Sequence, residues 1–326
     1  MKRNGKYLLV PSMVWLAVFF VIPMLIVVAV SFASRTAYGQ IVFGWTFQNY
    51  ARFLDPLYIS IFGRTIFIAV VTTVCTILMG YPLAYCIARL PRRLRQKGLI
   101  LCMIPFWINF LIRSYAWVII LRSQGVLNTI LMKLEIISQP IQFLYNEGAV
   151  MLGMVYALLP FMILPVYVSI EQLDRRLLEA AADLGASPVT AFRKITLPLT
   201  MPGIAAGTVL VFISSLGVFV GPDVMGGAKA ALVGNVIQNQ FLSARDWPFG
   251  SALSIVLALL SLILIFLYYR AIQAQKGDSD AENMAYPSPC FLRFGSAGLP
   301  LPAHSYPGSV LLQRLPHERC VGRLHV

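Results

Sequence analysis

The segment Leu178-Glu-Ala-Ala-Ala-Asp-Leu-Gly-Ala-Ser-Pro-Val-Thr-Ala-Phe-Arg-Lys-Ile-Thr-Leu-Pro-Leu199 lies between two long apolar segments and is the most informative stretch of the chain. Its polar and small residues stand at a defined spacing, which predicts a structured connection rather than a simple loop. The skeleton of this spacing consists of Glu179, Ala180, Ala181, Gly185, Ile195, Leu197 and Pro198.

Residues 174–199 predict two short helices joined by a tight turn. Asp174 is a good N-cap, because its carboxylate can accept from the free amides of the first turn. The alanines and leucines that follow are strong helix formers, and Gly185 is suited to a left-handed C-cap. Ser187-Pro188 predicts the start of the second helix. We expect that helix to end at the Leu-Pro pair that closes the segment.

The skeleton resembles the cytoplasmic EAA loop of ABC-importer permease subunits. The resemblance implies that the first helix docks in a groove of a separate ATPase, where Glu179 makes a polar contact and the two small alanines permit close approach. It assigns this coupling to Glu179, Ala180, Ala181, Gly185, Ile195, Leu197 and Pro198. It also implies that the ATPase binds ATP and Mg²⁺, so no cofactor is expected in this chain.

Composition predicts an all-α integral membrane protein. The chain of 326 residues is 58% hydrophobic and 12% charged, with a mean hydropathy of +0.76, and a soluble protein carries about twice that charge fraction. A membrane-spanning helix needs about 20 apolar residues. Six segments meet this requirement, and the third is interrupted only by Arg113. The predicted spans are residues 7–34, 65–88, 98–121, 148–170, 200–222 and 248–270.

Lysine and arginine distribution predicts the orientation of these spans. The side that holds both termini and the 171–199 loop carries about twice as many Lys and Arg residues as the other side, which places it in the cytoplasm. The net charge of +13 is therefore explained by topology and by attraction to anionic membrane lipid. The basic residues are not interleaved with aromatics in a patch, so nucleic-acid binding is not expected.

The apolar part of the chain lacks residues that enzymes and ATPases commonly use for catalysis. All three histidines lie beyond residue 300, and the chain has no GxxxxGK[ST] phosphate-binding motif. These observations argue against a membrane enzyme and against ATP hydrolysis by this chain. A secondary transporter is a further alternative, and it should show an internal repeat and an acidic residue at mid-membrane. Neither feature is evident in the sequence.

The C-terminal part differs from the rest. Residues 1–275 form the predicted permease domain, whereas residues 276–326 are rich in Pro, Gly and Ser and show no helical or strand periodicity. Prolines such as those in 286–290 and 299–303 prevent a regular helix. We interpret 276–326 as a tail that is either disordered or an out-of-frame extension.

Further blocks narrow the family. Gly80-Tyr-Pro-Leu-Ala84, Pro105-Phe-Trp-Ile-Asn109, Asp223-Val-Met-Gly-Gly-Ala-Lys229 and Arg245-Asp-Trp-Pro-Phe-Gly250 resemble spermidine/putrescine importer permeases of the first-subunit type. The resemblance implies the fold of a type I ABC importer permease in a bacterial inner membrane. It also implies a second permease, an ATPase dimer and an extracytoplasmic substrate-binding protein as partners. Iron, an oxyanion or an amino-acid derivative remains an alternative substrate.

A polycation that crosses the membrane needs carboxylates or aromatic faces along its route. Candidates for the substrate path are Asp223, Trp107, Tyr115 and Phe219. We expect Arg113 to extend its side chain towards the membrane surface or to pair with an acidic group.

Overall fold

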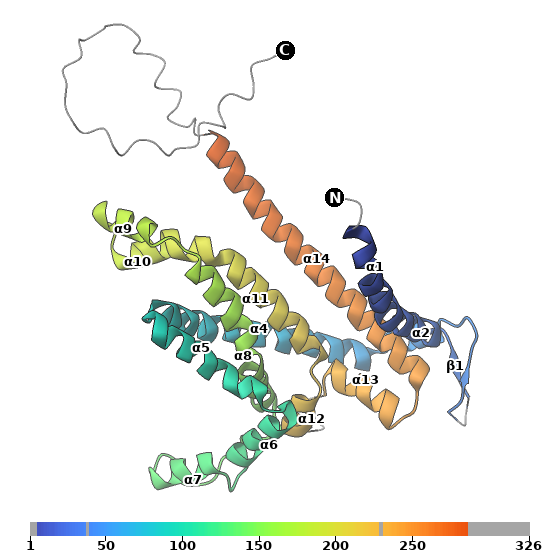
Figure 1. The fold of residues 1–326 in the computed structure, drawn as a ribbon. Helices are drawn as coiled ribbons and strands as arrows, with labels where there is room; N and C mark the ends of the chain where they lie inside the picture. The colour runs from blue at the N-terminus through green and yellow to red at the C-terminus, as the bar shows by residue number, and fades with distance from the viewer. Residues whose placement is uncertain (1–4, 37–38, 228–230, 286–326) are drawn as a thin grey trace, which may run out of the picture. The chain divides into compact units, whose positions relative to one another are not determined.

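The computed structural model describes residues 5–36, 39–227 and 231–285, and this part is predominantly helical (Figure 1). Its first half contains α1 (Gly5–Leu16), the π-helical turn η1 (Ala17–Val21), α2 (Ile22–Ser31), β1 (Ser34–Arg35), β2 (Ile41–Val42), α3 (Gln48–Phe53), α4 (Pro56–Arg89), α5 (Arg92–Trp107), α6 (Phe110–Leu121) and α7 (Val126–Lys133). Its second half contains α8 (Glu147–Glu171), α9 (Arg175–Asp183), α10 (Pro188–Ala191), the π-helical turn η2 (Phe192–Thr196), α11 (Leu197–Gly217), α12 (Val220–Gly226), α13 (Val233–Leu242) and α14 (Trp247–Ala285). The two short strands pair antiparallel.

Five helical segments of the described part are long and apolar enough to cross a membrane. They are Pro11–Ser31, Pro56–Arg89, Glu147–Glu171, Pro188–Gly217 and Trp247–Arg270. Each overlaps one of the predicted spans. A sixth crossing exists only if the bent pair Arg92–Trp107 and Phe110–Lys133 counts as one span.

The predicted third span, residues 98–121, is not one continuous helix. The two helices of this region, α5 and α6, are bent by 90° at a break around Ile108. Ile108 has an extended backbone, and the Asn109 side chain accepts from the Leu111 amide at 2.8 Å, which caps the new helix. Pro105 already removes one backbone donor from the end of α5, which weakens the helix where the break occurs.

The predicted fifth span, residues 200–222, also ends earlier than expected. Its helix α11 stops at Gly217 because Val218 is extended, and the short helix α12 begins at Val220. In both the third and the fifth span, the apolar pattern continues across a change of direction. Hydropathy alone does not predict where a helix breaks, because the residues on both sides of the break are apolar.

Helices α4, α8 and α11 form the central packing unit (Figure 1). Small residues allow their backbones to approach closely, as is typical of membrane helices. A Cβ atom at Gly80 would lie 2.9 Å from the Met162 side chain, and one at Gly207 would lie 2.7 Å from the Met162 sulfur. A Cβ atom at Gly203 would lie 2.6 Å from the Pro165 carbonyl oxygen. These three glycines therefore fix how α4 and α11 sit against α8.

The C-terminal helix α14 continues to Ala285, ten residues into the segment 276–326 that was predicted as a tail. The residues 276–285 contain no proline, and the first proline of the tail is Pro287. Since the residue before a proline disfavours the α conformation, a helix is expected to end at about this point. Residues 286–326 lie outside the described part of the chain.

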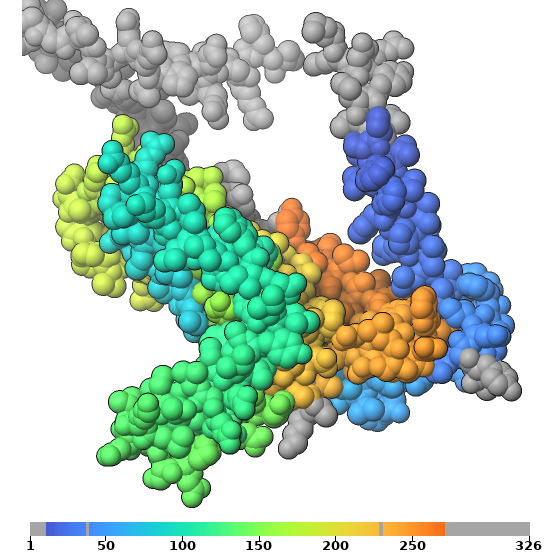
Figure 2. Space-filling model, turned by 60° about the horizontal axis from the view of Figure 1, so that its bottom comes forward, coloured from blue at the N-terminus to red at the C-terminus, as the bar shows by residue number. Residues whose placement is uncertain are grey.

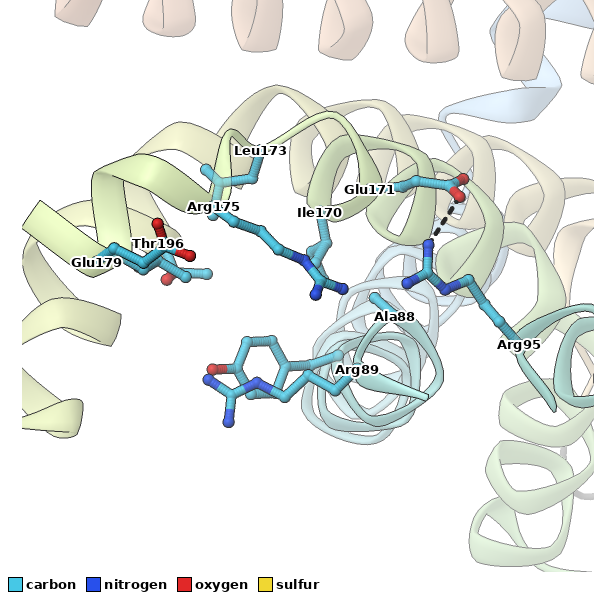
Figure 3. A pocket seen from close by; sticks show the side chains of 11 residues that line it. Ala88, Arg89, Arg95, Ile170, Glu171, Leu173, Arg175, Glu179 and Thr196 are labelled. Carbon is cyan, nitrogen blue, oxygen red and sulfur yellow. Dashed lines mark hydrogen bonds and ion pairs between the residues drawn. The ribbon is translucent and has the colours of Figure 1, made fainter. Parts of the chain in front are cut away.

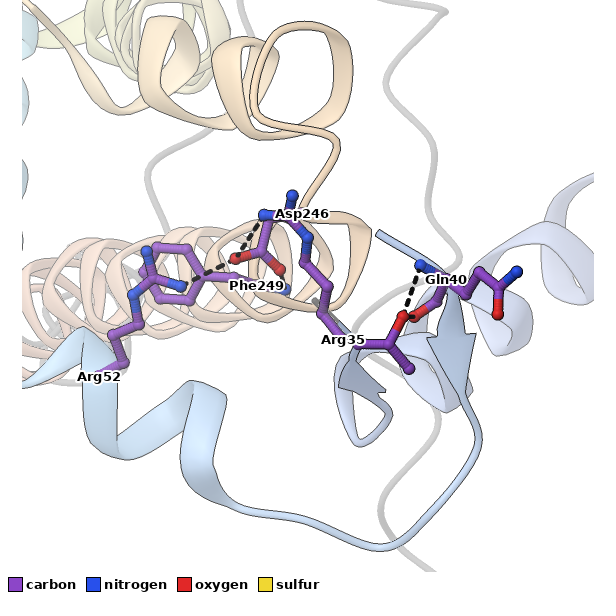
Figure 4. A network of polar contacts seen from close by, with 6 residues as sticks. Arg35, Gln40, Arg52, Asp246 and Phe249 are labelled. Carbon is purple, nitrogen blue, oxygen red and sulfur yellow. Dashed lines mark hydrogen bonds and ion pairs between the residues drawn. The ribbon is translucent and has the colours of Figure 1, made fainter. Parts of the chain in front are cut away.

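A buried carboxylate connects segments that are distant in sequence (Figure 4). Asp246 lies just before α14, and its side chain is only 8% exposed. Its carboxylate accepts from Arg52 at 2.8 Å, lies 3.9 Å from the Arg35 guanidinium, and accepts from the Phe249 amide at 3.3 Å. The Arg52 guanidinium also lies 4.1 Å from the centroid of the Phe249 ring. This network joins β1 and α3 to the beginning of α14.

Replacing Asp246 by asparagine is expected to destabilise the protein by about 1–2 kcal/mol, because two arginines lose their buried countercharge while the shape is kept. The thermal midpoint of the protein in detergent measures this loss. Glu147→Gln is the matched control, since the Glu147–Arg64 pair is 2.7 Å long but about 40% exposed on both sides. Equal midpoints for the two variants would show that the Asp246 network does not stabilise the fold.

Candidate functional site: the 171–199 segment and an aromatic pocket

The turn after α9 has the predicted geometry. The Asp174 carboxylate accepts from the Arg176 amide at 3.0 Å and caps the first turn. At the other end, Gly185 has a φ of +78°, its amide donates to Ala182 O at 2.9 Å, and the Ala186 amide donates to Ala181 O at 2.9 Å. These two bonds form a Schellman C-cap, which requires a residue that adopts positive φ without strain. The predicted left-handed glycine cap is confirmed.

The start of the second helix is also confirmed. The Ser187 hydroxyl accepts from the Thr190 amide at 3.3 Å, and Pro188 occupies the first turn.

The predicted end of the second helix at Leu197-Pro198 was wrong, because the helix continues through η2 into α11. Within η2 the Leu197 amide donates to Phe192 O, five residues back. A π-helical turn is wider than an α-helical turn and bonds to a different carbonyl. This local geometry accommodates Pro198, which has no amide hydrogen to contribute.

The proposed coupling residues differ in exposure. Glu179, Ala180, Gly185 and Pro198 are exposed, Ile195 and Leu197 are half-buried, and Ala181 is buried. Two large apolar side chains beside the turn are also exposed, namely Leu184 at 89% and Val189 at 74%. The sequence patterns did not single out this apolar pair. Leu184 directly precedes Gly185, and Val189 lies in the first turn of the helix that Ser187 caps.

A pocket of about 410 Å³ lies where α9 meets the ends of α4 and α8 and the start of α5 (Figure 3). Arg89, Arg95 and Arg175 line it together with Glu171 and Glu179. Arg95 donates to the Glu171 carboxylate at 3.0 Å. Glu179 lies on the opposite side of the pocket from this ion pair (Figure 3). In Figure 2 the yellow-green surface of α9 and α10 lies beside the blue-green start of α5. Sequence reasoning counted these arginines as topology signals and did not place them together.

A second pocket, of about 500 Å³, occupies the break between α5 and α6 and the break after α11. We call it the aromatic pocket, because five aromatic side chains line it: Phe106, Trp107, Phe110, Phe161 and Phe219. The structure therefore brings together Trp107 and Phe219, two of the four predicted path residues. Tyr115 and Asp223 are exposed and do not line it.

Arg113 lies in the aromatic pocket, and the prediction for it was wrong. Its side chain does not extend to the surface, since the residue is only 8% exposed, and it has no acidic partner among the described residues. Instead its guanidinium donates to Pro105 O at 2.9 Å. The break in the span explains this contact, because the last carbonyls of α5 have no amide from a following turn. Arg113 thus ties α6 back to α5 across the bend.

Comparisons with known proteins identify the family to which this helical chain belongs. The profile of the family "Binding-protein-dependent transport system inner membrane component" matches residues 77–276. Two similar proteins are both named spermidine/putrescine transport system permease protein PotB. The one from Haemophilus influenzae is 48% identical over 257 residues, covering 79% of this chain and 90% of that protein. The one from Salmonella typhimurium is 44% identical over 274 residues, covering 83% and 96%.

A crystal structure of a bacterial alginate ABC transporter, in complex with an alginate-bound periplasmic protein, contains a chain of similar fold. The TM-score is 0.68 at 20% identity, with 82% of this chain and 93% of that chain covered. The helical fold, the family profile and the relatives agree: this chain belongs to the family of binding-protein-dependent transport system inner membrane components.

Proposed function

We propose that this chain is a permease subunit of an ATP-driven importer for polyamines such as spermidine and putrescine. The observation that carries the proposal is the 44–48% identity to permeases named for these substrates, over about four fifths of the chain. Family membership alone would leave iron, oxyanions or amino-acid derivatives open as substrates. The aromatic pocket is consistent with a cationic solute, because aromatic faces attract ammonium groups.

In this proposal the chain crosses the membrane six times, with the bent α5–α6 pair counted as the third span. Both termini and α9 lie in the cytoplasm, which the two-to-one distribution of Lys and Arg supports. The discontinuous third span fits a transporter, because broken helices at membrane depth are tolerated where they line a cavity. Both breaks, after Trp107 and after Gly217, border the aromatic pocket.

The proposed partners are an ATPase dimer, a second permease of the same family and an extracytoplasmic binding protein. The ATPase would bind ATP and Mg²⁺, and this chain would be a non-catalytic subunit. We assign the docking surface to α9 and the turn at Gly185, because Glu179, Leu184 and Val189 are exposed there around a well-capped rigid turn. Leu184 and Val189 are large apolar side chains exposed beside this turn, in a segment that the proposal places outside the membrane.

Within the path, we assign contact with the substrate to the faces of Trp107 and Phe219. Asp223 and Tyr115 lie outside the aromatic pocket, so we assign them no contact with a substrate held there. Arg113 holds the bend through Pro105 O and is not a ligand in this assignment, since its charge would repel an ammonium group.

Radiolabelled spermidine and putrescine uptake by the complete complex in proteoliposomes tests the proposal. Wild-type complex should import both compounds only with ATP inside, and Trp107→Ala should lower uptake by about fivefold if one cation–π contact of about 1 kcal/mol is lost. Trp107→Phe should retain most uptake. Tyr115→Ala is the matched control, an exposed aromatic outside the pocket.

Uptake of an oxyanion, iron or an amino-acid derivative in place of polyamines would contradict the substrate assignment. Uptake that persists without the ATPase would instead favour a secondary transporter.

A further inference from the structure

The π-helical turn η2 is a mechanical weak point between the docking surface and the membrane helices. It connects α10 to α11, and the only route along the chain from the Gly185 turn to α11 passes through it. Its backbone bonds span five residues, and Pro198 directly after it contributes no amide. A helix bends most easily at such a place. Force that passes along the chain from α9 and α10 towards α11 would therefore be absorbed at η2 unless side chains brace the turn.

Phe192, the first residue of η2, supplies such a brace. Its ring packs edge-on against two tyrosines of α4, with centroid distances of 5.8 Å to Tyr81 and 5.5 Å to Tyr85. The interplanar angles are 79° and 81°, while the two tyrosine rings lie nearly parallel to each other at 14°. Edge-to-face contacts are the favoured arrangement for aromatic rings. The rings thus hold the start of η2 against α4.

A buried hydrogen-bond chain braces the other end of the turn. The Thr200 hydroxyl in α11 donates to Thr196 O at 2.8 Å, so the Tyr81 hydroxyl, 3.1 Å from the Thr200 oxygen, is the donor between them. Thr200 is fully buried. Tyr81 therefore contacts the start of η2 directly, with its ring on Phe192, and reaches the end of η2 at Thr196 through the Thr200 hydroxyl.

The first turns of α11 are anchored independently. Gly203 and Gly207 bring α11 into close contact with α8, as described above. If η2 is rigid, movement of the α9–α10 pair displaces α4, α8 and α11 together. If η2 bends, less of the movement of α10 reaches α11 and the α4 surface beside it.

We infer that Phe192 is a positioning residue for transport: with Tyr81 it locks η2 against α4, so that movement driven by the ATPase reaches the membrane helices. This inference rests on the proposed function, because it needs a partner that moves α9. It predicts a specific defect, in which the ATPase still docks and hydrolyses ATP but less substrate crosses per ATP. A residue that only stabilises the fold would lower abundance and leave the ratio unchanged.

The test compares substrate imported with ATP hydrolysed in the same proteoliposomes containing the complete complex. Phe192→Ala is expected to lower this ratio by about fivefold or more, because two ring contacts are lost. Membrane abundance and co-purification of the ATPase should match the wild type. Phe192→Leu keeps an apolar side chain of similar size, so it remains informative if the alanine variant folds poorly, and it should also lower the ratio. Tyr81→Phe removes only the hydroxyl and should cause a smaller decrease.

Phe67→Ala is the matched control, because Phe67 is an aromatic residue of the same helix α4 whose side chain is 57% exposed. It should keep the wild-type ratio. A wild-type ratio in both Phe192→Ala and Phe192→Leu would overturn the inference. Loss of ATPase co-purification in these variants would also overturn it, since Phe192 would then act at the docking surface. Absence of ATP-dependent uptake by the wild-type complex would instead overturn the proposed function.

Discussion

Gly185→Val is expected to lower uptake by the complete importer by about tenfold while membrane abundance stays near that of the wild type. The φ of +78° at this position costs a non-glycine residue about 1–2 kcal/mol. A Cβ atom there would meet nothing within 4 Å, so backbone strain is the only local effect. Relief of that strain would turn α9 away from α10 and misplace Glu179, Leu184 and Val189. Less ATPase should therefore co-purify with the variant.

The matched control for this prediction is Gly185→Asn, since asparagine tolerates the left-handed conformation better than a β-branched residue. It should retain most of the uptake and most of the bound ATPase. Glu179→Ala should act in the same direction as the valine substitution, because it removes an exposed carboxylate from the same surface. Normal uptake and normal ATPase retention in both Gly185→Val and Glu179→Ala would exclude this segment as the coupling element.

Gly203→Ala is expected to reduce the amount of folded protein in the membrane severely. An added Cβ would lie 2.5 Å from the Ser169 Cβ and 2.6 Å from the Pro165 carbonyl oxygen. Neither atom can move without shifting helix α8, and overpacking of this kind costs about 1–3 kcal/mol. The measurement is the monodisperse yield of fluorescently tagged protein after size-exclusion chromatography in detergent, together with its thermal midpoint.

Gly63→Ala provides the matched control for the packing prediction. Gly63 also lies inside a helix, α4, but a Cβ atom there would meet nothing within 4 Å. Because alanine is the better helix former, this variant should be neutral or slightly more stable. Adding Ser169→Gly to Gly203→Ala should restore only part of the yield, since the contact with the backbone oxygen remains. Equal yields for Gly203→Ala and Gly63→Ala would show that the close contact between α11 and α8 is not needed.

The class of the protein and the local form of the 171–199 segment were predictable from the amino-acid sequence. Long apolar segments predict membrane helices because span length follows from bilayer thickness. The caps at Asp174, Gly185 and Ser187 were also predictable, since each depends on contacts within a few residues along the chain. The 179–198 skeleton resembles that of the family, and the family profile and the relatives show the membership.

The places where helices change direction, and the distant side chains that meet, depend on how the helices pack and were not predictable from the sequence. The bend at Ile108 lies inside an apolar segment whose only charged residue is Arg113, because both sides of a broken span must remain apolar. The bend in turn frees the Pro105 carbonyl that Arg113 binds, a contact that side-chain chemistry alone did not indicate. Likewise, Leu197-Pro198 reads as a helix end, and the continuation through η2 depends on a wider turn that is braced by α4. Contacts between separate helices depend on how the helices pack, and local sequence patterns do not encode that packing.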